Sequence, residues 1–268
     1  MCCLFLAASS TVAIAQTSVV DLVNPIIGTN GMGHTFPGAC VPFGLVQLSP
    51  DTDTIPHNVD GKYQPRSYEY CAGYQHKDSS IVGFSHTHFS GTGHSDLGDI
   101  LIMPTTGTLK LNPGTATNPD GGYRSRFSHG TEISRPGYYE VMLADYGVKA
   151  QLTTTQRVGI HKYTYPTNSE NQRIILDMIH GIYNYDGKVL WTNIRVENDT
   201  LVTGYRITNG WARTNYTYFA MSFSKPITHY GCEEKAKVNY RGGYAKFNMK
   251  ENFPDIGGRK IVAYFDFD

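Results

Sequence analysis

From residue 80 onward, hydrophobic and polar positions alternate within short runs that are separated by Gly, Pro, Asn or Asp. In the run 157–165, Val158 and Ile160 fall on one side, and His161 and Tyr163 fall on the other. This period of two is typical of a strand, and no long stretch repeats apolar residues at the helical period. Such runs recur at intervals of roughly ten residues, at 137–144, 148–155, 157–165, 172–179, 188–196, 199–208 and 215–224.

Short strands at this spacing predict an all-β fold, a large antiparallel β-sandwich. No internal repeat or linker divides the chain, so we expect residues 16–268 to form one such domain. The final run, 259–268, places Ile261, Ala263, Phe265 and Phe267 on one side, and the sequence stops while the pattern continues. Because an apolar strand needs neighbours for its side chains and its backbone, we expect a truncation at this end.

Two stretches, 24–44 and 49–78, break the strand pattern. Both are dense in Gly, Pro, Asn and Asp and have little periodicity. Long irregular segments inside a domain are usually functional or flexible, so we expect functional residues in or beside them.

The first fifteen residues, MCCLFLAASSTVAIA, predict a signal peptide. They are apolar and uncharged, and they end in the small-x-small pattern that signal peptidase cleaves. The stretch is too short to be a permanent membrane anchor, so we expect no transmembrane segment and a secreted or periplasmic protein. A lipoprotein anchored through Cys2 or Cys3 is the alternative, but no short apolar lipobox precedes them.

Charge and composition narrow the classes of partner. The chain has 23 Lys+Arg and 23 Asp+Glu, and charged residues make up 17% of it. This balance argues against a nucleic-acid footprint or a polybasic membrane surface. The nineteen tyrosines, with many Thr and Asn, suit neutral, hydroxyl-rich ligands such as sugars. The same residues are also common in strands for structural reasons alone.

The segment FSHTHFSGTGHSDLGD, residues 84–99, concentrates histidine, glycine and aspartate. His86 and His88 are two apart in an expected strand, so both rings share a face and could bind one metal ion, with His94 or Asp96 as a third ligand. Alternatively, both rings are hydrogen-bonded in a polar cleft. Asp96 and Asp99 could accept hydrogen bonds from sugar hydroxyls or simply tie the turn together.

The segment GTNGMGHTFPGA, residues 28–39, has a similar composition around His34 and the Phe36-Pro37 corner. Two Gly-rich loops that both carry His and Thr suggest one shared surface. A flat aromatic ring beside hydroxyls and imidazoles would hold a pyranose by stacking and hydrogen bonding. Two ordinary, tightly packed loops are the alternative.

Catalytic residues are not identified by the sequence. Glycoside hydrolysis needs two carboxyl groups that flank the bond. The pairs Asp96 with Asp99 and Glu132 with Glu140 have no context that distinguishes them, and no nucleophile motif is present.

Two long motifs, VNPIIGTNGMGHTFPGACVPFGLVQLSPDT and CAGYQHKDSSIVGFSHTHFSGTGHSDLGDILIMPTTG, carry a family resemblance. They closely resemble the start of glycoside hydrolase family 92, bacterial exo-acting α-mannosidases that trim mannose from glycans. The match is strong from residue 23 to about 107, and the strand-rich remainder agrees more loosely. The family often has a tryptophan before the CAGY motif, whereas this chain reads HNVDGKYQPRSYEY there, which leaves the linkage preference open.

The resemblance implies a secreted two-domain enzyme, in which an N-terminal β-sandwich precedes a larger helical (α/α)6 catalytic domain that this chain lacks. It implies a calcium-dependent, inverting reaction with a glutamic acid as general acid and an aspartate as general base. Those residues and most calcium ligands belong to the helical domain, so no catalytic residue or metal ligand is assigned here, and this chain alone is expected to be inactive. The expected partners are mannose-containing glycans and the helical domain.

By the same resemblance, the two loops are expected to face the catalytic domain and to line the substrate cleft. The cleft candidates are His34, Thr35, Phe36, Pro37, His86, His88, Ser90, Gly91, Thr92, Asp96 and Asp99. Two other functions remain open at this point: a stand-alone carbohydrate-binding module, and a metalloenzyme that uses His86 and His88.

Overall fold

The computed structural model describes residues 18–91, 96–235 and 252–268. Within these ranges every pairing between strands is antiparallel. The only helices there are four short 3-10 turns: η1 (Val19–Leu22), η2 (Pro65–Tyr70), η3 (Pro119–Gly121) and η4 (His129–Thr131). The prediction of an all-β, antiparallel fold is therefore confirmed.

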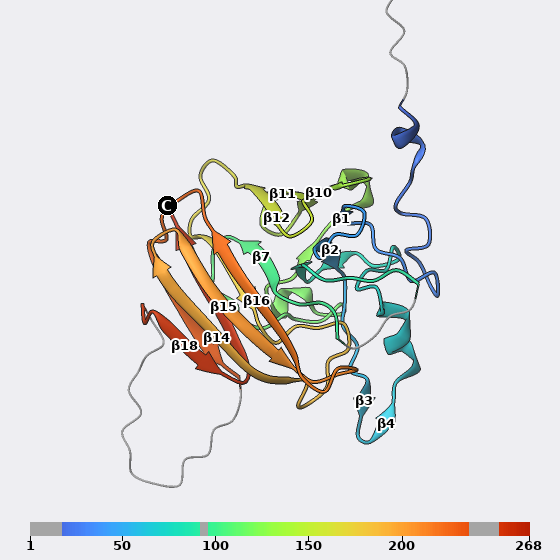
Figure 1. Ribbon diagram of the computed structural model, residues 1–268. Coiled ribbons are helices and arrows are strands. Elements are labelled where there is room, and N and C mark those ends of the chain that lie inside the picture. The colour runs from blue at the N-terminus through green and yellow to red at the C-terminus, as the bar shows by residue number, and fades with distance from the viewer. Residues whose placement is uncertain (1–17, 92–95, 236–251) are drawn as a thin grey trace, which may run out of the picture.

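One seven-stranded sheet and two four-stranded sheets form the domain (Figure 1). The seven-stranded sheet contains, in spatial order, β1 (Ala39–Cys40), β2 (Gln47–Asp51), β6 (Gly83–Ser85), β7 (Leu101–Thr105), β13 (Gln172–Asp177), β19 (Ile261–Phe267) and β17 (His229–Glu234). The first four-stranded sheet contains β12 (Gly159–Thr164), β11 (Val148–Thr154), β10 (Tyr138–Leu143) and β9 (Ile133–Arg135). The second contains β16 (Asn215–Ser222), β15 (Leu201–Thr208), β14 (Val189–Asn198) and β18 (Asp255–Gly258). Two small ribbons pair β3 (Asn58–Val59) with β4 (Lys62–Tyr63), and β5 (Ser80–Ile81) with β8 (Ser125–Arg126).

The seven-stranded sheet is covered on both faces. On β7, Leu101 and Met103 pack into the hydrophobic cluster that contains β10 and β11, whereas Ile102 packs into the cluster that contains β14 and β15. Successive side chains of a strand point to opposite faces, so the two four-stranded sheets lie on opposite sides of the central one. The sandwich thus has three layers.

This arrangement explains why the central strands do not alternate in sequence. All five residues of β7, LIMPT, are buried, as are the first five of β19, IVAYF. A strand buried on both faces needs apolar side chains at consecutive positions. The outer strands face solvent on one side only, and β11 alternates buried and half-buried residues along its whole length.

The last strand lies inside the central sheet. β19 pairs with β13 on one side and with β17 on the other. Its predicted apolar side is confirmed, because Ile261, Ala263 and Phe265 are buried in one cluster and Phe267 packs against it.

The structure also shows which side of β12 faces the core. Val158 and Ile160 are 54% and 47% exposed, while His161 and Tyr163 point inward. The polar-looking side of this strand therefore faces the core. Among the described residues, no helix is long and apolar enough to cross a membrane. The predicted signal peptide, residues 1–15, lies outside the described residues.

Leu176 tests the three-layer packing, because it is fully buried on β13 between the central sheet and the β14–β15 layer. We expect Leu176→Ala to lower the free energy of unfolding by about 2–5 kcal/mol, through lost burial and the cavity left behind. Urea denaturation followed by tryptophan fluorescence would measure it. The matched control, Ile160→Ala on the exposed side of β12, should change it by less than about 1 kcal/mol. Equal losses in the two variants would contradict the proposed layering.

Candidate functional site

The histidine-rich segment connects β6 to β7 as an irregular hairpin. Its two arms remain paired beyond the strands: the His86 amide donates to the Asp99 carbonyl, and the Gly98 amide donates to the Thr87 carbonyl, both at 2.9 Å. Gly98 has φ +84°, and a Cβ there would lie 2.8 Å from the backbone nitrogen of Ile182. Only glycine fits this close approach. Two residues singled out from the sequence, Thr92 and His94, lie outside the described residues.

The two Gly-rich loops are in contact, as the sequence suggested. The Gly91 amide donates to the His34 carbonyl at 2.8 Å, and the rings of Phe36 and His88 are 5.3 Å apart. Their residues differ in access to solvent. His34, Pro37, His88 and Asp99 are buried; Thr35, Phe36, His86 and Asp96 are half-buried; Ser90 and Gly91 are exposed. That these loops line a substrate cleft stays a prediction.

His88 is bound at both ring nitrogens. Nδ1–H donates to the Gln47 carbonyl and Nε2–H donates to Asp51 Oδ1, both at 2.8 Å. The other oxygen of Asp51 accepts from the Ser85 hydroxyl and from His180 Nε2, both at 2.7 Å. The side chains of His88 and Asp51 are 0% exposed, so this network is closed to solvent.

Asp51 is held as a carboxylate by its two histidines. Burial alone would raise the pKa of Asp51, but the charge of His88 and the hydrogen bonds from His180 and His88 outweigh it and hold that pKa well below its ordinary value. The Ser85 hydroxyl lies 3.2 Å from His88 Nε2, but it donates to the Asp51 carboxylate, and His88 Nε2–H is also directed to that carboxylate. These three side chains therefore do not form a nucleophile–base relay. The arrangement fixes the hairpin to the sheet rather than activating a hydroxyl.

His86 belongs to a second, separate chain of hydrogen bonds. Its Nδ1 donates to the Ile100 carbonyl at 2.6 Å, which leaves Nε2 to accept from His161 Nε2 at 3.0 Å. His161 Nδ1 in turn accepts from the Tyr163 hydroxyl at 2.7 Å. Burial lowers the pKa of His86 to about 4 and that of His161 well below its ordinary value, so both rings are neutral near pH 7.

These contacts bear on the His-x-His metal hypothesis. The nitrogens of His86 and His88 are all engaged with protein groups, and the two rings belong to different networks. The structure directs no lone pair of either ring to a common metal position.

The two aspartates of the hairpin hold other segments in place. Asp99 forms an ion pair with the fully buried guanidinium of Arg206 and accepts from the Thr87 hydroxyl at 2.8 Å. The Asp96 carboxylate accepts from the Trp211 and Ala212 amides at 2.8 and 3.1 Å. Both carboxylates therefore bind protein groups from β15 and the loop after it.

Lys188 lies next to this group. Its Nζ is buried and has no hydrogen-bond partner. Burial, with repulsion by Arg206, lowers the pKa of Lys188 to about 7.

Glu132 and Glu140, a carboxylate pair that the sequence did not single out as catalytic, do not face each other. Glu132 accepts from the inward-pointing hydroxyls of Tyr74 and Tyr139, at 2.9 and 2.6 Å. Glu140 follows Tyr139 on β10 and so points to the opposite face, where it binds Lys149 at 3.1 Å. Carboxyl groups on opposite faces of a sheet cannot flank one glycosidic bond.

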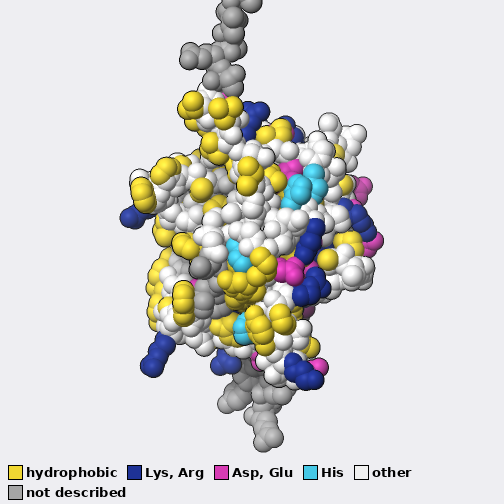
Figure 2. Space-filling model, turned by 90° about the vertical axis from the view of Figure 1, so that its right-hand side faces the viewer, with side chains coloured by type: hydrophobic (Ala, Val, Ile, Leu, Met, Phe, Trp, Pro, Cys, Tyr) yellow, Lys and Arg dark blue, Asp and Glu magenta, His cyan; other side chains and the backbone are white. Residues whose placement is uncertain are grey.

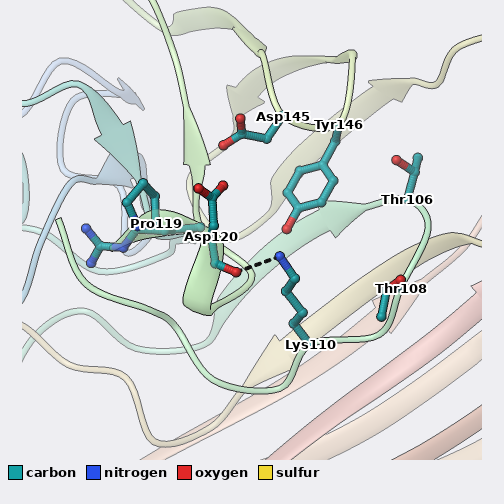
Figure 3. Close-up of a pocket in the computed structure, with 8 residues that line it drawn as sticks. Thr106, Thr108, Lys110, Pro119, Asp120, Asp145 and Tyr146 are labelled. Carbon is teal, nitrogen blue, oxygen red and sulfur yellow. Dashed lines mark hydrogen bonds between the residues drawn. The ribbon is translucent and has the colours of Figure 1, made fainter. Parts of the chain in front are cut away.

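Two pockets lie away from these loops. The first, about 300 Å³, is lined by Lys110, Asp120, Arg124, Asp145 and other polar groups (Figure 3). The second, about 270 Å³, is lined by Thr54, Asn184, Tyr185, Lys260 and neighbouring residues. Neither is lined by a predicted cleft residue.

Long-range partners were missed by the sequence analysis. Asp51 lies near the end of the first long motif, but nothing in that motif indicates its partners, and His180 and Arg206 lie outside both motifs. Asp51 contacts His88 and His180, which are 37 and 129 residues away, and Arg206 contacts Asp99, which is 107 residues away. The composition of the hairpin was the only available clue, since buried His and Asp need partners somewhere in the chain.

Comparison with known proteins decides the family. The family model described as "Glycosyl hydrolase family 92 N-terminal domain" matches residues 22–268. The chain belongs to this family of N-terminal domains. The match covers all three layers of the sandwich and both loops of the family 92 domain.

Solved structures agree with this assignment. The family GH92 α-mannosidase BT3965 from Bacteroides thetaiotaomicron, solved with mannoimidazole, is 39% identical to this chain. The aligned region includes 93% of this chain and 30% of the BT3965 chain, and the TM-score is 0.79. The family GH92 inverting mannosidase BT2199 of the same species is 25% identical, covers 94% of this chain and 30% of its own, and gives a TM-score of 0.67.

A curated fungal protein is also similar. It is described as an uncharacterized secreted glycosidase of Arthroderma benhamiae and is 28% identical over 170 residues, which cover 60% of this chain and 19% of that protein. The family 92 domain described here thus spans less than a third of the length of each of these relatives.

The neutral His86 gives the domain a pH-dependent stability. Its pKa is about 4 when folded, against an ordinary value of 6.5. As pH falls through this interval the unfolded chain binds a proton that the folded chain does not, so the free energy of unfolding should fall, by about 3 kcal/mol in total. Urea denaturation at a series of pH values would measure it. His86→Gln should flatten the profile and the exposed His57→Gln should not; an unchanged slope in His86→Gln would refute the assignment.

Proposed function

We propose that this chain is the N-terminal part of a longer, secreted exo-acting α-mannosidase that releases mannose from glycans with inversion of configuration. The 39% identity over 93% of the chain to a protein described as an α-mannosidase is the observation that carries the proposal. The BT2199 enzyme, described as inverting, supports the stereochemistry. Secretion is supported by the apolar segment 1–15 and by the description of the fungal relative.

In this proposal the general acid and base belong to the part of the longer protein that the chain does not span. The carboxylates of the two pairs considered in the sequence all bind protein donors: Asp96, Asp99, Glu132 and Glu140. A catalytic carboxyl group must instead reach the leaving oxygen or a water molecule. The role of this domain is then to hold the two loops against the catalytic part.

An exposed apolar surface beside the loops supports this role. Phe43, Leu45 and Phe89 are 104%, 68% and 56% exposed. β2 and β6 are antiparallel and pair Ser49 with Ser85. Leu45 precedes Ser49 by four residues and Phe89 follows Ser85 by four, so both lie past the same end of this strand pair. Figure 2 shows several groups of hydrophobic side chains at the surface on one side of the molecule. Exposed apolar side chains of this kind are typical of a surface that another domain covers.

Calcium dependence is part of the proposal, and the described residues contain no cluster of three carboxylates that would mark a calcium site. Calcium takes six to eight oxygen ligands. The one group of three or more metal-ligating side chains among the described residues contains two histidines and a single carboxylate. We therefore propose that calcium is bound by residues outside this chain, and no step of the reaction is assigned to it here.

A carbohydrate-binding module is the second candidate function. On the outer face of the β14–β16 sheet, Trp191, Tyr216 and Tyr218 are 41%, 54% and 70% exposed. The rings of Tyr216 and Tyr218 are stacked, with centroids 6.4 Å apart and an interplanar angle of 10°. Flat, exposed aromatic rings stack on the faces of pyranoses, so this surface could bind a glycan without any catalytic domain.

Activity measurements on two lengths of the protein separate these functions. We expect the full-length protein to release mannose from α-mannosides and to lose activity with EDTA, and the 268-residue chain to release none under the same conditions. Affinity electrophoresis in mannan would be run in parallel. Mannan binding by the short chain with no activity in either protein would favour the module, and efficient hydrolysis by the short chain would refute the division of labour.

The exposed apolar surface gives a second test in the full-length protein. We expect Phe43→Asn with Phe89→Asn to lower kcat/KM at least tenfold, because the loops would no longer seat against the catalytic part. The same changes should alter the stability of the 268-residue chain by less than about 1 kcal/mol, since both rings are exposed. The control is Ile160→Asn. Ile160 is also an exposed apolar residue, but it lies on the outer side of β12, so this change should leave the activity unchanged. Wild-type activity in the double variant would exclude this surface.

A further inference from the structure

Three metal-ligating side chains meet on the side of the domain where the β5–β8 ribbon ends. One nitrogen of His76, one of His129 and one carboxylate oxygen of Glu132 all lie within 4.8 Å of one another. These residues take no part in the hairpin networks of His86 and His88. Within 18–91, 96–235 and 252–268, they form the one such group.

The fold brings these residues together from two segments. The β5–β8 pairing sets Ser80 opposite Arg126, and the Phe127 amide extends it by donating to the Ser79 carbonyl at 3.0 Å. His76 lies just before this ribbon, in a turn that the Asp78 amide closes by donating to the Gln75 carbonyl at 3.0 Å. Ser128 caps η4 by accepting from the Gly130 amide at 3.2 Å. Its single turn places His129 and Glu132 at i and i+3, on one face.

Glu132 is held in a fixed orientation. Its side chain is 3% exposed. One oxygen accepts from the Tyr139 hydroxyl at 2.6 Å, and the Tyr74 hydroxyl lies 2.9 and 3.0 Å from the two oxygens. Such outer hydrogen bonds are the way in which proteins orient a metal-ligating carboxylate.

The two histidines, unlike Glu132, are not fully hydrogen-bonded. The rings of His76 and His129 lie 3.9 Å apart, tilted by 31°. The Nδ1 atom of His76 is buried and has no hydrogen-bond partner. A buried, unpaired polar atom costs free energy, and an approaching cation is one way to satisfy the cluster. His129 is 37% exposed, which gives an ion a route from solvent.

We propose that His76, His129 and Glu132 bind one divalent transition-metal ion, with Zn²⁺ the best match to the donors. Two imidazoles and one carboxylate form a zinc ligand set, and the remaining position would hold water on the side of the exposed His129. His129 Nδ1 now donates to Glu132 Oε2 at 2.7 Å. Tetrahedral zinc would replace that proton and hold the two atoms about 3.3 Å apart, a small adjustment for an exposed ring. Calcium is disfavoured, because it requires oxygen ligands.

The bound ion would fasten the segment before β5 to the one after β8. Because the ion binds the folded chain, it should also raise the midpoint of thermal unfolding, and above Kd this rise should grow with the logarithm of the ion concentration. This function is independent of mannoside hydrolysis, so the inference stands or falls separately from the proposed activity.

Metal titration of the untagged, chelator-treated 268-residue chain tests the site. We expect one equivalent of Zn²⁺ to bind by calorimetry, and Co²⁺ to give the visible absorption bands of a four-coordinate site. His76→Ala and His129→Ala should each weaken binding by about 100-fold or more, and Tyr139→Phe, which removes an outer hydrogen bond, by about tenfold. His57→Ala, an exposed histidine elsewhere, is the matched control and should bind like the wild type.

Two outcomes would overturn the proposal. One is the absence of stoichiometric Zn²⁺ binding and of Co²⁺ bands in the wild-type chain. The other is unchanged affinity in both His76→Ala and His129→Ala. Glu132→Gln is used only if its circular dichroism and thermal unfolding match the wild type, since Glu132 also binds two buried tyrosines. If Glu132→Gln does not fold, the metal affinities of His76→Ala and His129→Ala still test the site.

Discussion

The buried carboxylate of Asp51 is the constraint around which the end of this domain that carries the two Gly-rich loops is organised. A carboxylate without solvent is costly unless charged or hydrogen-bonding partners surround it. Asp51 ends β2, and its partners come from β6, from the hairpin through His88 and from the segment after β13 through His180. The turn at Gly73 closes over it so tightly that a Cβ there would lie 2.0 Å from Asp51 Oδ1. The end of β2, the segment from Ser85 to His88 and the segment around His180 therefore share one charge, and moving any of them would unpair it.

This network gives the histidines of the hairpin a structural role that differs from a first reading of their sequence. His88 neutralises Asp51, and His86 sits in the neutral chain that leads through His161 to Tyr163. With the imidazoles directed inward, the exposed residues in the described part of the hairpin are Phe89, Ser90 and Gly91. A rigid base carrying exposed loops is the usual way to present a surface to a neighbouring domain or to a ligand. The family 92 relationship and the exposed apolar residues beside these loops fit the same division between scaffold and contact surface.

The cluster of His76, His129 and Glu132 follows a different logic. There the carboxylate is oriented by tyrosine hydroxyls and faces two imidazoles, one of which has an unpaired nitrogen. Both places combine histidine with a buried carboxylate. Around Asp51 the hydrogen bonds of these groups are complete, whereas in this cluster one imidazole nitrogen has no partner. The motif that drew attention in the sequence is fully satisfied, while the incomplete cluster combines a histidine from the CAGY segment with residues more than fifty positions away.

The sequence by itself determined the strands and which residues of a strand share a side. Alternation is a property of a few neighbouring residues, so the runs that became β10, β11, β15 and β16 and the apolar side of β19 could be predicted without knowing any partner. The long loop motifs also carried the family resemblance. Only the tertiary structure decided that β7 and β13 are buried on both faces, that β12 turns His161 and Tyr163 inward, and that Asp51, His180 and Arg206 complete the hairpin. Those outcomes depend on contacts between residues up to 129 positions apart, and local periodicity contains no information about which distant side chain will neutralise a buried charge.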